Sequence, residues 1–132
     1  MEEKEKMIAF IYYSLVLIGS IAMCIWFHEL GHYLYFFHMI GKKVKISVRR
    51  AGLFGFSFFV GNNDDYVGLT DLQYFKLCGW GVLFGFVPMF LLLPFLTFNG
   101  LFGFVFWLYI LGSVKDIRQM IIYLKEQKGC KK

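Results

Sequence analysis

The chain contains little charge for its length. Only 17% of its 132 residues are charged, whereas 58% are hydrophobic and 21% are aromatic. Soluble domains contain about 25% charged residues, so this composition excludes an ordinary water-soluble domain and indicates a membrane protein. The basic residues behind the net charge of +5 lie beside apolar segments, as in the cytoplasmic flanks of membrane helices. We therefore expect a lipid bilayer as a partner, and no nucleic acid.

Cysteine is also scarce. The three cysteines, Cys24, Cys78 and Cys130, form no CxxC pair and no disulfide framework. The N-terminus lacks the net-positive start of a secretory signal, and the apolar run that begins at Met7 is longer than the apolar core of such a signal. We expect this run to be a retained membrane helix.

Three apolar segments divide the chain. They cover about 7–40, about 72–98 and about 101–124, and each is long enough to cross a hydrocarbon core of ~30 Å. At 1.5 Å per residue the first would measure roughly 50 Å, so it must tilt or run on toward the cytosolic interface, with Gly41 as its stop. The sequence predicts an all-α membrane protein with about three transmembrane helices, forming a single domain over residues 1–132.

Residues 43–60, between the first two segments, have the pattern of β-strands. Val44, Ile46 and Val48 alternate with polar residues, which is the period of a strand. Gly52 and Gly55 then interrupt an aromatic run. We expect a short β-hairpin or re-entrant element at the membrane surface, followed by a polar turn at residues 61–65.

Local signals mark the second segment. Thr70–Gln73 fits a capping box at the start of a helix. Gly81 and Gly85 are four residues apart, so this helix can pack closely on a neighbour. Pro88 and Pro94 are expected to kink it.

Charge predicts the orientation in the membrane. The loop after the first segment and the C-terminal tail are both basic, whereas the expected turn at Asn99–Gly100 is uncharged. The positive-inside rule then puts the loop and the tail in the cytoplasm and the N-terminus outside. Three crossings satisfy this arrangement, and we expect an integral protein of the cell membrane.

The first apolar segment contains His28-Glu29-Leu30-Gly31-His32, an HExxH motif. On a helix His28 and His32 share one face, so both imidazoles can bind one metal ion, and Glu29 lies beside them, where it can take a proton from water on the metal. Such groups are costly in hydrocarbon and are usually functional there. The motif predicts one zinc ion per chain, with His28 and His32 as ligands and Glu29 as the catalytic base, although other divalent ions can occupy such a site.

Asp116 is the candidate third ligand, because a catalytic zinc needs about three protein ligands besides water. Of the nine acidic residues, only Glu29 and Asp116 fall inside apolar segments. The histidine pair and Asp116 also lie at the same depth, roughly 13–16 Å from the cytosolic side at 1.5 Å per residue. A divalent ion, two neutral histidines and two carboxylates sum to about zero charge, which makes the cluster easier to bury.

Other interpretations of these residues stay open at this point. Lys115 and Arg118 flank Asp116, so this stretch could be the solvated cytosolic end of a helix. Cys24, one turn before the motif, is either a small packing residue or an alternative third ligand. His38 lies off the face of the histidine pair and is expected at the membrane interface. The aromatic run at residues 102–109 is expected to face lipid or to pack.

Together these residues resemble the site-2 protease class of intramembrane zinc metalloproteases. The resemblance rests on residues 28–32 in the first helix and Asp116 in the third. Residues 43–60 are similar to the membrane-associated strand element that follows the HExxH helix in that class. The second motif of the class usually reads Asn-x-x-Pro-x-Pro-x-x-Asp-Gly, but the matching stretch here, Gly112-Ser113-Val114-Lys115-Asp116-Ile117, has neither the prolines nor the final glycine. The chain therefore looks more like the small, divergent zincin-like members.

The resemblance implies a zinc metalloendopeptidase that hydrolyses a peptide bond in or near a transmembrane segment of a membrane-protein substrate. A helical substrate must unwind locally, and an exposed strand edge within residues 43–60 could hold the unwound stretch by strand addition. Two other classes of function stay open. One is a non-catalytic pseudoprotease that binds a partner helix, and the other is a small metal-binding or transport protein.

Overall fold

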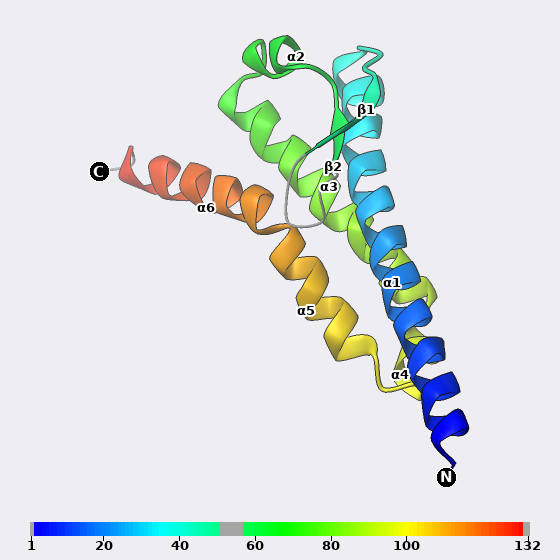
Figure 1. The fold of residues 1–132 in the computed structure, drawn as a ribbon. Helices are drawn as coiled ribbons and strands as arrows, with labels where there is room; N and C mark the ends of the chain where they lie inside the picture. The colour runs from blue at the N-terminus through cyan, green and yellow to red at the C-terminus, as the bar shows by residue number, and fades with distance from the viewer. Residues whose placement is uncertain (1, 51–56, 131–132) are drawn as a thin grey trace.

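The computed structural model describes residues 2–50 and 57–130, which form a mostly helical fold with one small sheet (Figure 1). The elements in chain order are α1 (Glu3–Leu34), η1 (Tyr35–Ile40), β1 (Ile46–Arg49), β2 (Ser57–Val60), α2 (Asn63–Val67), α3 (Asp71–Leu91), α4 (Leu93–Phe98), α5 (Phe102–Gly112) and α6 (Val114–Gly129). The two long helices, α1 and α3, lie side by side in opposite directions, and the hairpin and α2 lie at one end of the pair. The mainly helical fold with a strand element after the first helix is confirmed.

The first apolar segment is one continuous helical element. α1 passes directly into the π-helical turn η1, and Gly41 follows in the left-handed conformation (φ 75°). Glycine adopts this conformation without steric cost, so it ends the helix as predicted. Within residues 2–50 and 57–130, two helical stretches are long and apolar enough to cross a membrane: Glu3–Ile40 and α3.

A glycine sets the distance between α1 and α3. A Cβ atom at Gly31 would lie 2.5 Å from the carbonyl oxygen of Trp80 and 2.9 Å from the Cβ of Phe84. Neither atom is the free end of a flexible side chain, so a side chain at this position would force the helices apart. The second variable position of the HExxH motif, Gly31, is therefore also a packing position.

The two glycines of α3 leave room for side chains from neighbouring helices. A Cβ atom at Gly81 would collide with the imidazole of His32, and one at Gly85 would collide with the phenol of Tyr109. The predicted close packing at Gly81 and Gly85 is confirmed. An imidazole from α1 and a phenol from α5 fill the space.

The second apolar segment is divided into α3 and α4, with Leu92 between them. Pro88 lies inside α3, and Pro94 lies in the first turn of α4, where its missing N–H breaks no helical hydrogen bond. The predicted kink is therefore a break between the two prolines. Gly100 (φ 67°) then turns the chain into α5, as the Asn99–Gly100 pair predicts.

The third apolar segment is two helices, whereas a single helix was predicted over residues 101–124. α5 ends at Ser113, and α6 turns sharply away from it (Figure 1). The reason lies in the composition of the second half. Bases recur along α6, at Lys115, Arg118, Lys125 and Lys128, whereas α5 contains none. The chain changes direction at the point where the apolar run ends.

β1 and β2 form an antiparallel pair in which Ile46 lies opposite Val60 and Val48 lies opposite Phe58. This confirms a hairpin in the predicted stretch, residues 43–60. The interruption expected at Gly52 and Gly55 lies outside the described residues.

Capping motifs begin α2 and α3. The Asn62 backbone N–H donates to Asp65 Oδ2 (2.7 Å), so a short helix occupies the end of the predicted polar turn. That bond, together with the Lys42 ammonium, lowers the pKa of Asp65, so the carboxylate stabilises the turn at neutral pH and loses this contribution as the pH falls through its pKa. At α3 the Thr70 N–H donates to Gln73 Oε1 (2.9 Å) and the Gln73 N–H donates to Thr70 Oγ1 (3.2 Å), which confirms the predicted capping box.

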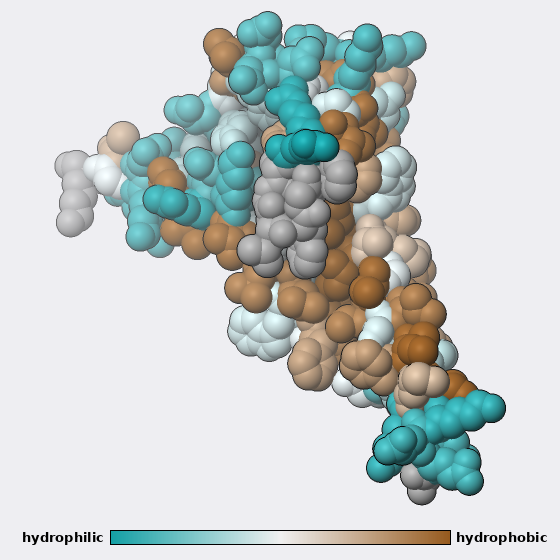
Figure 2. Space-filling model, viewed as in Figure 1, coloured by the Kyte–Doolittle hydropathy of each residue, from teal (hydrophilic) through white to brown (hydrophobic). Residues whose placement is uncertain are grey.

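Hydrophobic side chains cover a broad band of the surface in Figure 2. The band includes the visible sides of α1 and α5, and hydrophilic residues bound it at the N-terminal tip and over the hairpin, α2 and α6. Many large apolar residues in these helices are exposed, among them Phe10, Leu15, Ile18, Phe104 and Trp107. An exposed apolar surface of this kind indicates an interaction with an apolar environment.

Gly31→Ala tests the contact between α1 and α3. We expect it to lower the free energy of unfolding by about 1–3 kcal/mol, because the added methyl group meets backbone rather than a movable side chain. Thermal unfolding of the detergent-purified protein measures the change. Gly19→Ala is the matched control on the same helix, since nothing lies within 4 Å of its Cβ position. Equal losses of stability in the two variants would contradict the close packing.

Candidate metal centre

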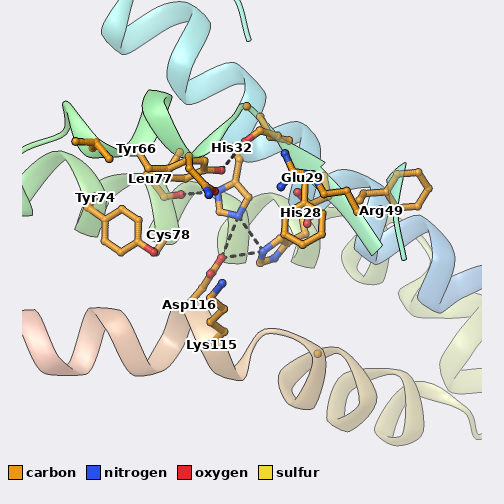
Figure 3. A pocket seen from close by; sticks show the side chains of 17 residues that line it. His28, Glu29, His32, Arg49, Tyr66, Tyr74, Leu77, Cys78, Lys115 and Asp116 are labelled. Atoms are coloured by element: carbon orange, nitrogen blue, oxygen red, sulfur yellow. Dashed lines mark hydrogen bonds and ion pairs between the residues drawn. The ribbon is translucent and has the colours of Figure 1, made fainter. Parts of the chain in front are cut away.

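Three side chains from two helices meet at one point. His28 Nε2 lies 2.9 Å from Asp116 Oδ2 and 3.1 Å from His32 Nε2, and His32 Nε2 lies 3.0 Å from the same carboxylate oxygen (Figure 3). The histidines come from α1 and the aspartate from the first turn of α6, 88 positions after His28. The structure thus brings together the three predicted ligands at one level, as the estimate of helix depth predicts.

The break at Ser113 directs Asp116 into this cluster. α6 begins at the end of α5, runs in a new direction and contacts α3. There the ring of Tyr123 stacks on that of Phe75 (4.8 Å between centroids), and the methyl group of Met120 lies beside Gly79. The Asp116 side chain is consequently only 16% exposed. It is not the solvated end of a helix, which was the competing interpretation.

The other candidate residues lie elsewhere. Cys24 is buried in an apolar cluster with Met89 and Val105, so its side chain packs and does not join Asp116. His38 is exposed in η1, away from the histidine pair. Asp116 is therefore the third member of the cluster.

Hydrogen bonds on the far side of each imidazole determine its tautomer. His32 Nδ1 donates to the carbonyl of Leu77 (3.1 Å), which can only accept. His28 Nδ1 lies 2.9 Å from the hydroxyl of Tyr109, which itself donates to the Val82 carbonyl (2.8 Å) and so accepts from His28. Both rings then carry their proton on Nδ1, and both Nε2 lone pairs face Asp116. This is the arrangement that prepares histidines to bind a metal.

The donor atoms fit a metal ion. Two imidazole nitrogens and a carboxylate oxygen, 2.9–3.1 Å apart, face one another, and such groups repel unless a proton or a metal cation lies between them. Zinc binds nitrogen and oxygen at about 2.0–2.2 Å, so the ligand atoms of a tetrahedral ion lie roughly 3.3 Å apart. Only a small expansion of the cluster is needed. His28, Glu29 and His32 also offer ligand atoms within 4.8 Å of one another, so this group could hold a metal ion.

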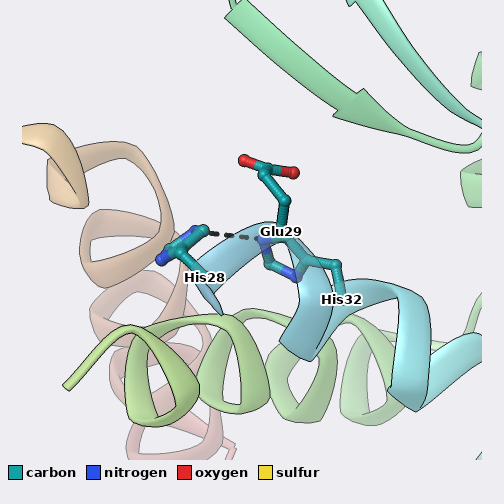
Figure 4. Close-up of side chains that lie close together, drawn as sticks. All are labelled: His28, Glu29 and His32. Atoms are coloured by element: carbon teal, nitrogen blue, oxygen red, sulfur yellow. Dashed lines mark hydrogen bonds between the residues drawn. The ribbon is translucent and has the colours of Figure 1, made fainter. Parts of the chain in front are cut away.

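Glu29 points in a different direction from Asp116. Figure 4 shows its carboxylate extending away from α3 toward the hairpin, on the open side of the histidine pair. One carboxylate oxygen lies within 4.8 Å of the histidine ring nitrogens. Glu29 therefore lies beside the cluster without being part of the ring formed by His28, His32 and Asp116.

Two cavities meet at the cluster. One, of about 600 Å³, is lined by β2 and α2 and by two cationic side chains, Arg49 and Lys115 (Figure 3). The other, of about 580 Å³, is mainly apolar and runs between α1 and α5 past Ile21 and Leu108. Both cavities reach His28 and Glu29, so the cluster is accessible from a polar side and from an apolar side.

Tyr109 is a functional candidate that sequence analysis assigned only to lipid contact or packing. It is buried, it binds His28, and Gly85 provides the space for its ring. Its position, seven residues before Asp116, is a spacing that puts two residues on one helix face. The break at Ser113 interrupts that face, so the spacing alone does not predict the contact.

Comparison with family models, curated proteins and solved structures finds no match to this chain. The fold and the site by themselves define a mainly helical protein with a buried cluster of two histidines and an aspartate. The assignment of a function therefore rests on the geometry of this cluster.

Tyr109→Phe tests the hydrogen bond behind His28. We expect metal binding to weaken by about 10–100-fold, because the His28 Nδ1–H loses its acceptor and the ring loses its fixed orientation. Competition with a chromophoric chelator measures the affinity for Zn²⁺, and cobalt absorption reports the coordination. Tyr123→Phe, which removes a hydroxyl on α6 outside the cluster, is the control. Unchanged affinity in Tyr109→Phe would exclude the orienting role.

Proposed function

We propose that this chain is an intramembrane zinc metalloprotease, a small and divergent member of the site-2 protease class. It would hydrolyse a peptide bond in or near a transmembrane segment of a membrane-protein substrate. The observation that carries the proposal is the triangle of His28 Nε2, His32 Nε2 and Asp116 Oδ2 with Glu29 beside it. The two histidines and Glu29 lie on a helical stretch long and apolar enough to cross a membrane. Three protein ligands with an open fourth position are typical of catalytic zinc.

The proposed membrane arrangement follows the hydrophobic band. α1 and α3 would cross the membrane, and α4 and α5 together would return the chain toward the cytoplasmic side, with the N-terminus outside and with the hairpin and α6 on the cytoplasmic side of the cell membrane. The basic loop and tail favour this orientation. α5 has 11 residues, about 17 Å of helix. The metal centre at the C-terminal end of α5 would therefore lie near the cytoplasmic boundary of the hydrophobic band. It would be closer to that boundary than the depth of roughly 13–16 Å estimated from the sequence at 1.5 Å per residue.

Each residue of the site would have a separate role in the hydrolysis. His28, His32 and Asp116 would hold the ion. The ion, when bound there, would supply Lewis acidity that polarises the scissile carbonyl and lowers the pKa of a bound water toward neutral. Glu29 would accept the proton of that water and pass it to the leaving amine. Tyr109 and the Leu77 carbonyl keep the imidazoles in the tautomer that leaves each Nε2 free.

The two cavities match the two parts of such a substrate. The mainly apolar cavity between α1 and α5 suits side chains of a membrane-embedded helix, and the cavity under β2 suits the stretch that unwinds. His28 and Glu29 line both cavities, so the peptide bond between the helical part of the substrate and its unwound part would lie at the metal centre.

The metal content of two variants distinguishes the metal ligand Asp116 from the catalytic base Glu29. We expect about one zinc ion per chain, lost in Asp116→Ala and retained in Glu29→Gln, because Glu29 lies outside the triangle. Elemental analysis of detergent-purified protein measures the ratio. A panel of quenched fluorescent single-pass membrane peptides, reconstituted with the protein, measures cleavage, which should disappear in both variants.

The same variants distinguish the alternatives. If Glu29→Gln cleaves as well as the wild type, the catalytic role is wrong. If the wild type holds zinc and cleaves no peptide, while a partner helix binds equally to wild type and Glu29→Gln, the chain is a pseudoprotease. Absence of metal in the wild type after zinc is resupplied would remove the basis of the proposal.

Within residues 2–50 and 57–130, β2 pairs with β1 alone, and residues of β2 line the polar cavity. The Gly61 N–H donates to the Lys45 carbonyl (2.7 Å), so by the antiparallel alternation the main-chain groups of Phe58 and Val60 point away from β1. The Val60 carbonyl already accepts from Tyr66 (2.6 Å). The N–H and C=O of Phe58 are therefore the groups that an added substrate strand would pair with.

Phe58→Pro tests this pairing because it removes the outward N–H without breaking the ladder to β1. We expect it to lower cleavage of the membrane peptides far more than Phe58→Ala, which removes the same ring but keeps the N–H. Both variants should retain zinc, which shows that the site is folded. Equal cleavage by the two variants would argue against strand addition at β2.

A further inference from the structure

α6 presents an apolar surface that no described element covers. Its exposed apolar residues are Val114, Ile121, Ile122 and Leu124, each 38–49% exposed. The opposite side of the helix is occupied, since Met120 and Tyr123 pack on α3 and Asp116 enters the metal centre. In Figure 2 apolar side chains follow the lower edge of α6, where they continue the hydrophobic band of α5.

Basic residues are interleaved with this apolar surface. Counted from Val114, Arg118 is four residues further along the helix, Ile121 is seven and Lys125 is eleven. These spacings put all four residues on one face of the helix. Lys128 continues the series, and Glu126 is the one acid of α6 besides Asp116. Long Lys and Arg side chains can lay their methylenes on an apolar surface and reach headgroups with their charge. A basic amphipathic helix of this kind is typical of a membrane surface with anionic lipids.

We propose that α6 docks on the surface of a bilayer that contains anionic lipids, and that this docking holds Asp116 at the histidine pair. The inference rests on the membrane setting of the proposed function. The occupant is the lipid surface, because the apolar residues need hydrocarbon while the bases beside them need phosphate.

The break between α5 and α6 at Ser113 explains how docking of α6 on the bilayer would affect the position of Asp116. α6 is connected to α5 through a break, so α5 does not determine its tilt. Asp116 lies in the first turn after that break, and its carboxylate must keep metal-ligand distances within about 0.2 Å. A bilayer that holds both the bases and the apolar residues of α6 restricts the tilt and therefore the position of the carboxylate.

The first test measures docking without reference to the metal. The full chain carries Leu124→Cys with Cys130→Ser and is labelled with the fluorophore NBD, since the two other cysteines are buried. It is reconstituted into phosphatidylcholine vesicles with or without phosphatidylglycerol, and nitroxide-labelled acyl chains quench the fluorophore. We expect stronger quenching with phosphatidylglycerol. Lys125→Gln with Lys128→Gln should weaken docking by about fivefold per charge.

The matched control is Lys4→Gln with Lys6→Gln, which removes two positive charges at the N-terminal end of α1 instead of two on α6. It should leave the quenching unchanged. Quenching that is insensitive to phosphatidylglycerol and to the α6 charges would overturn the proposal. So would full restoration of the wild-type behaviour by free phosphate in phosphatidylcholine vesicles.

The second test measures the affinity for Co²⁺ in the same vesicles. We expect affinity to rise with phosphatidylglycerol in the wild type and not in the Lys125/Lys128 variant. Lipid-dependent quenching with unchanged Co²⁺ affinity would overturn the coupling to Asp116. Absence of metal binding in every lipid would instead refute the proposed function, and the quenching experiment would still decide whether α6 docks.

Discussion

Two imidazoles and a carboxylate share one point in a mostly apolar interior, and much of the structure positions these three groups. A buried polar group is costly unless each of its donors and acceptors is paired. Here the Leu77 carbonyl accepts a hydrogen bond from His32 Nδ1–H, and the Tyr109 hydroxyl accepts one from His28 Nδ1–H. Both Nε2 atoms then face Asp116. The remaining requirement is positive charge among three facing acceptors, and a divalent ion would supply it, since its two charges would balance the two nearby carboxylates while both histidines stay neutral.

Space for these groups comes from glycine. The backbones of α1 and α3 approach closely at Gly31, while Gly81 and Gly85 admit the ring of His32 and the phenol of Tyr109. In the membrane setting of the proposed function, the hydrophobic effect would not favour contact between helices, so close packing and hydrogen bonds would hold them together. Both depend on these small residues, and the glycine within the HExxH motif serves the packing of the same helix that carries the ligands.

The break at Ser113 lets the basic helix α6 follow the apolar helix α5 in a different direction. A continuous helix would carry the bases that follow Val114 along the axis of α5, beside hydrocarbon. By turning, α6 points Asp116 inward from its first turn and leaves Arg118 and Lys125 exposed. One change of direction therefore supplies the third member of the cluster and the amphipathic surface at the edge of the hydrophobic band.

The sequence by itself determined what local patterns encode. The HExxH spacing put His28 and His32 on one face, the 70–73 capping box and Gly41 marked helix ends, and strand alternation marked the hairpin, because each depends on neighbours within a few residues. Asp116 was predictable as an acid within a largely apolar segment. Only the tertiary structure decided that the third segment breaks at Ser113, that Tyr109 orients His28, and that Gly81 and Gly85 receive side chains. These features depend on contacts between helices distant in the chain, and no local propensity specifies which side chain will fill the space beside a glycine.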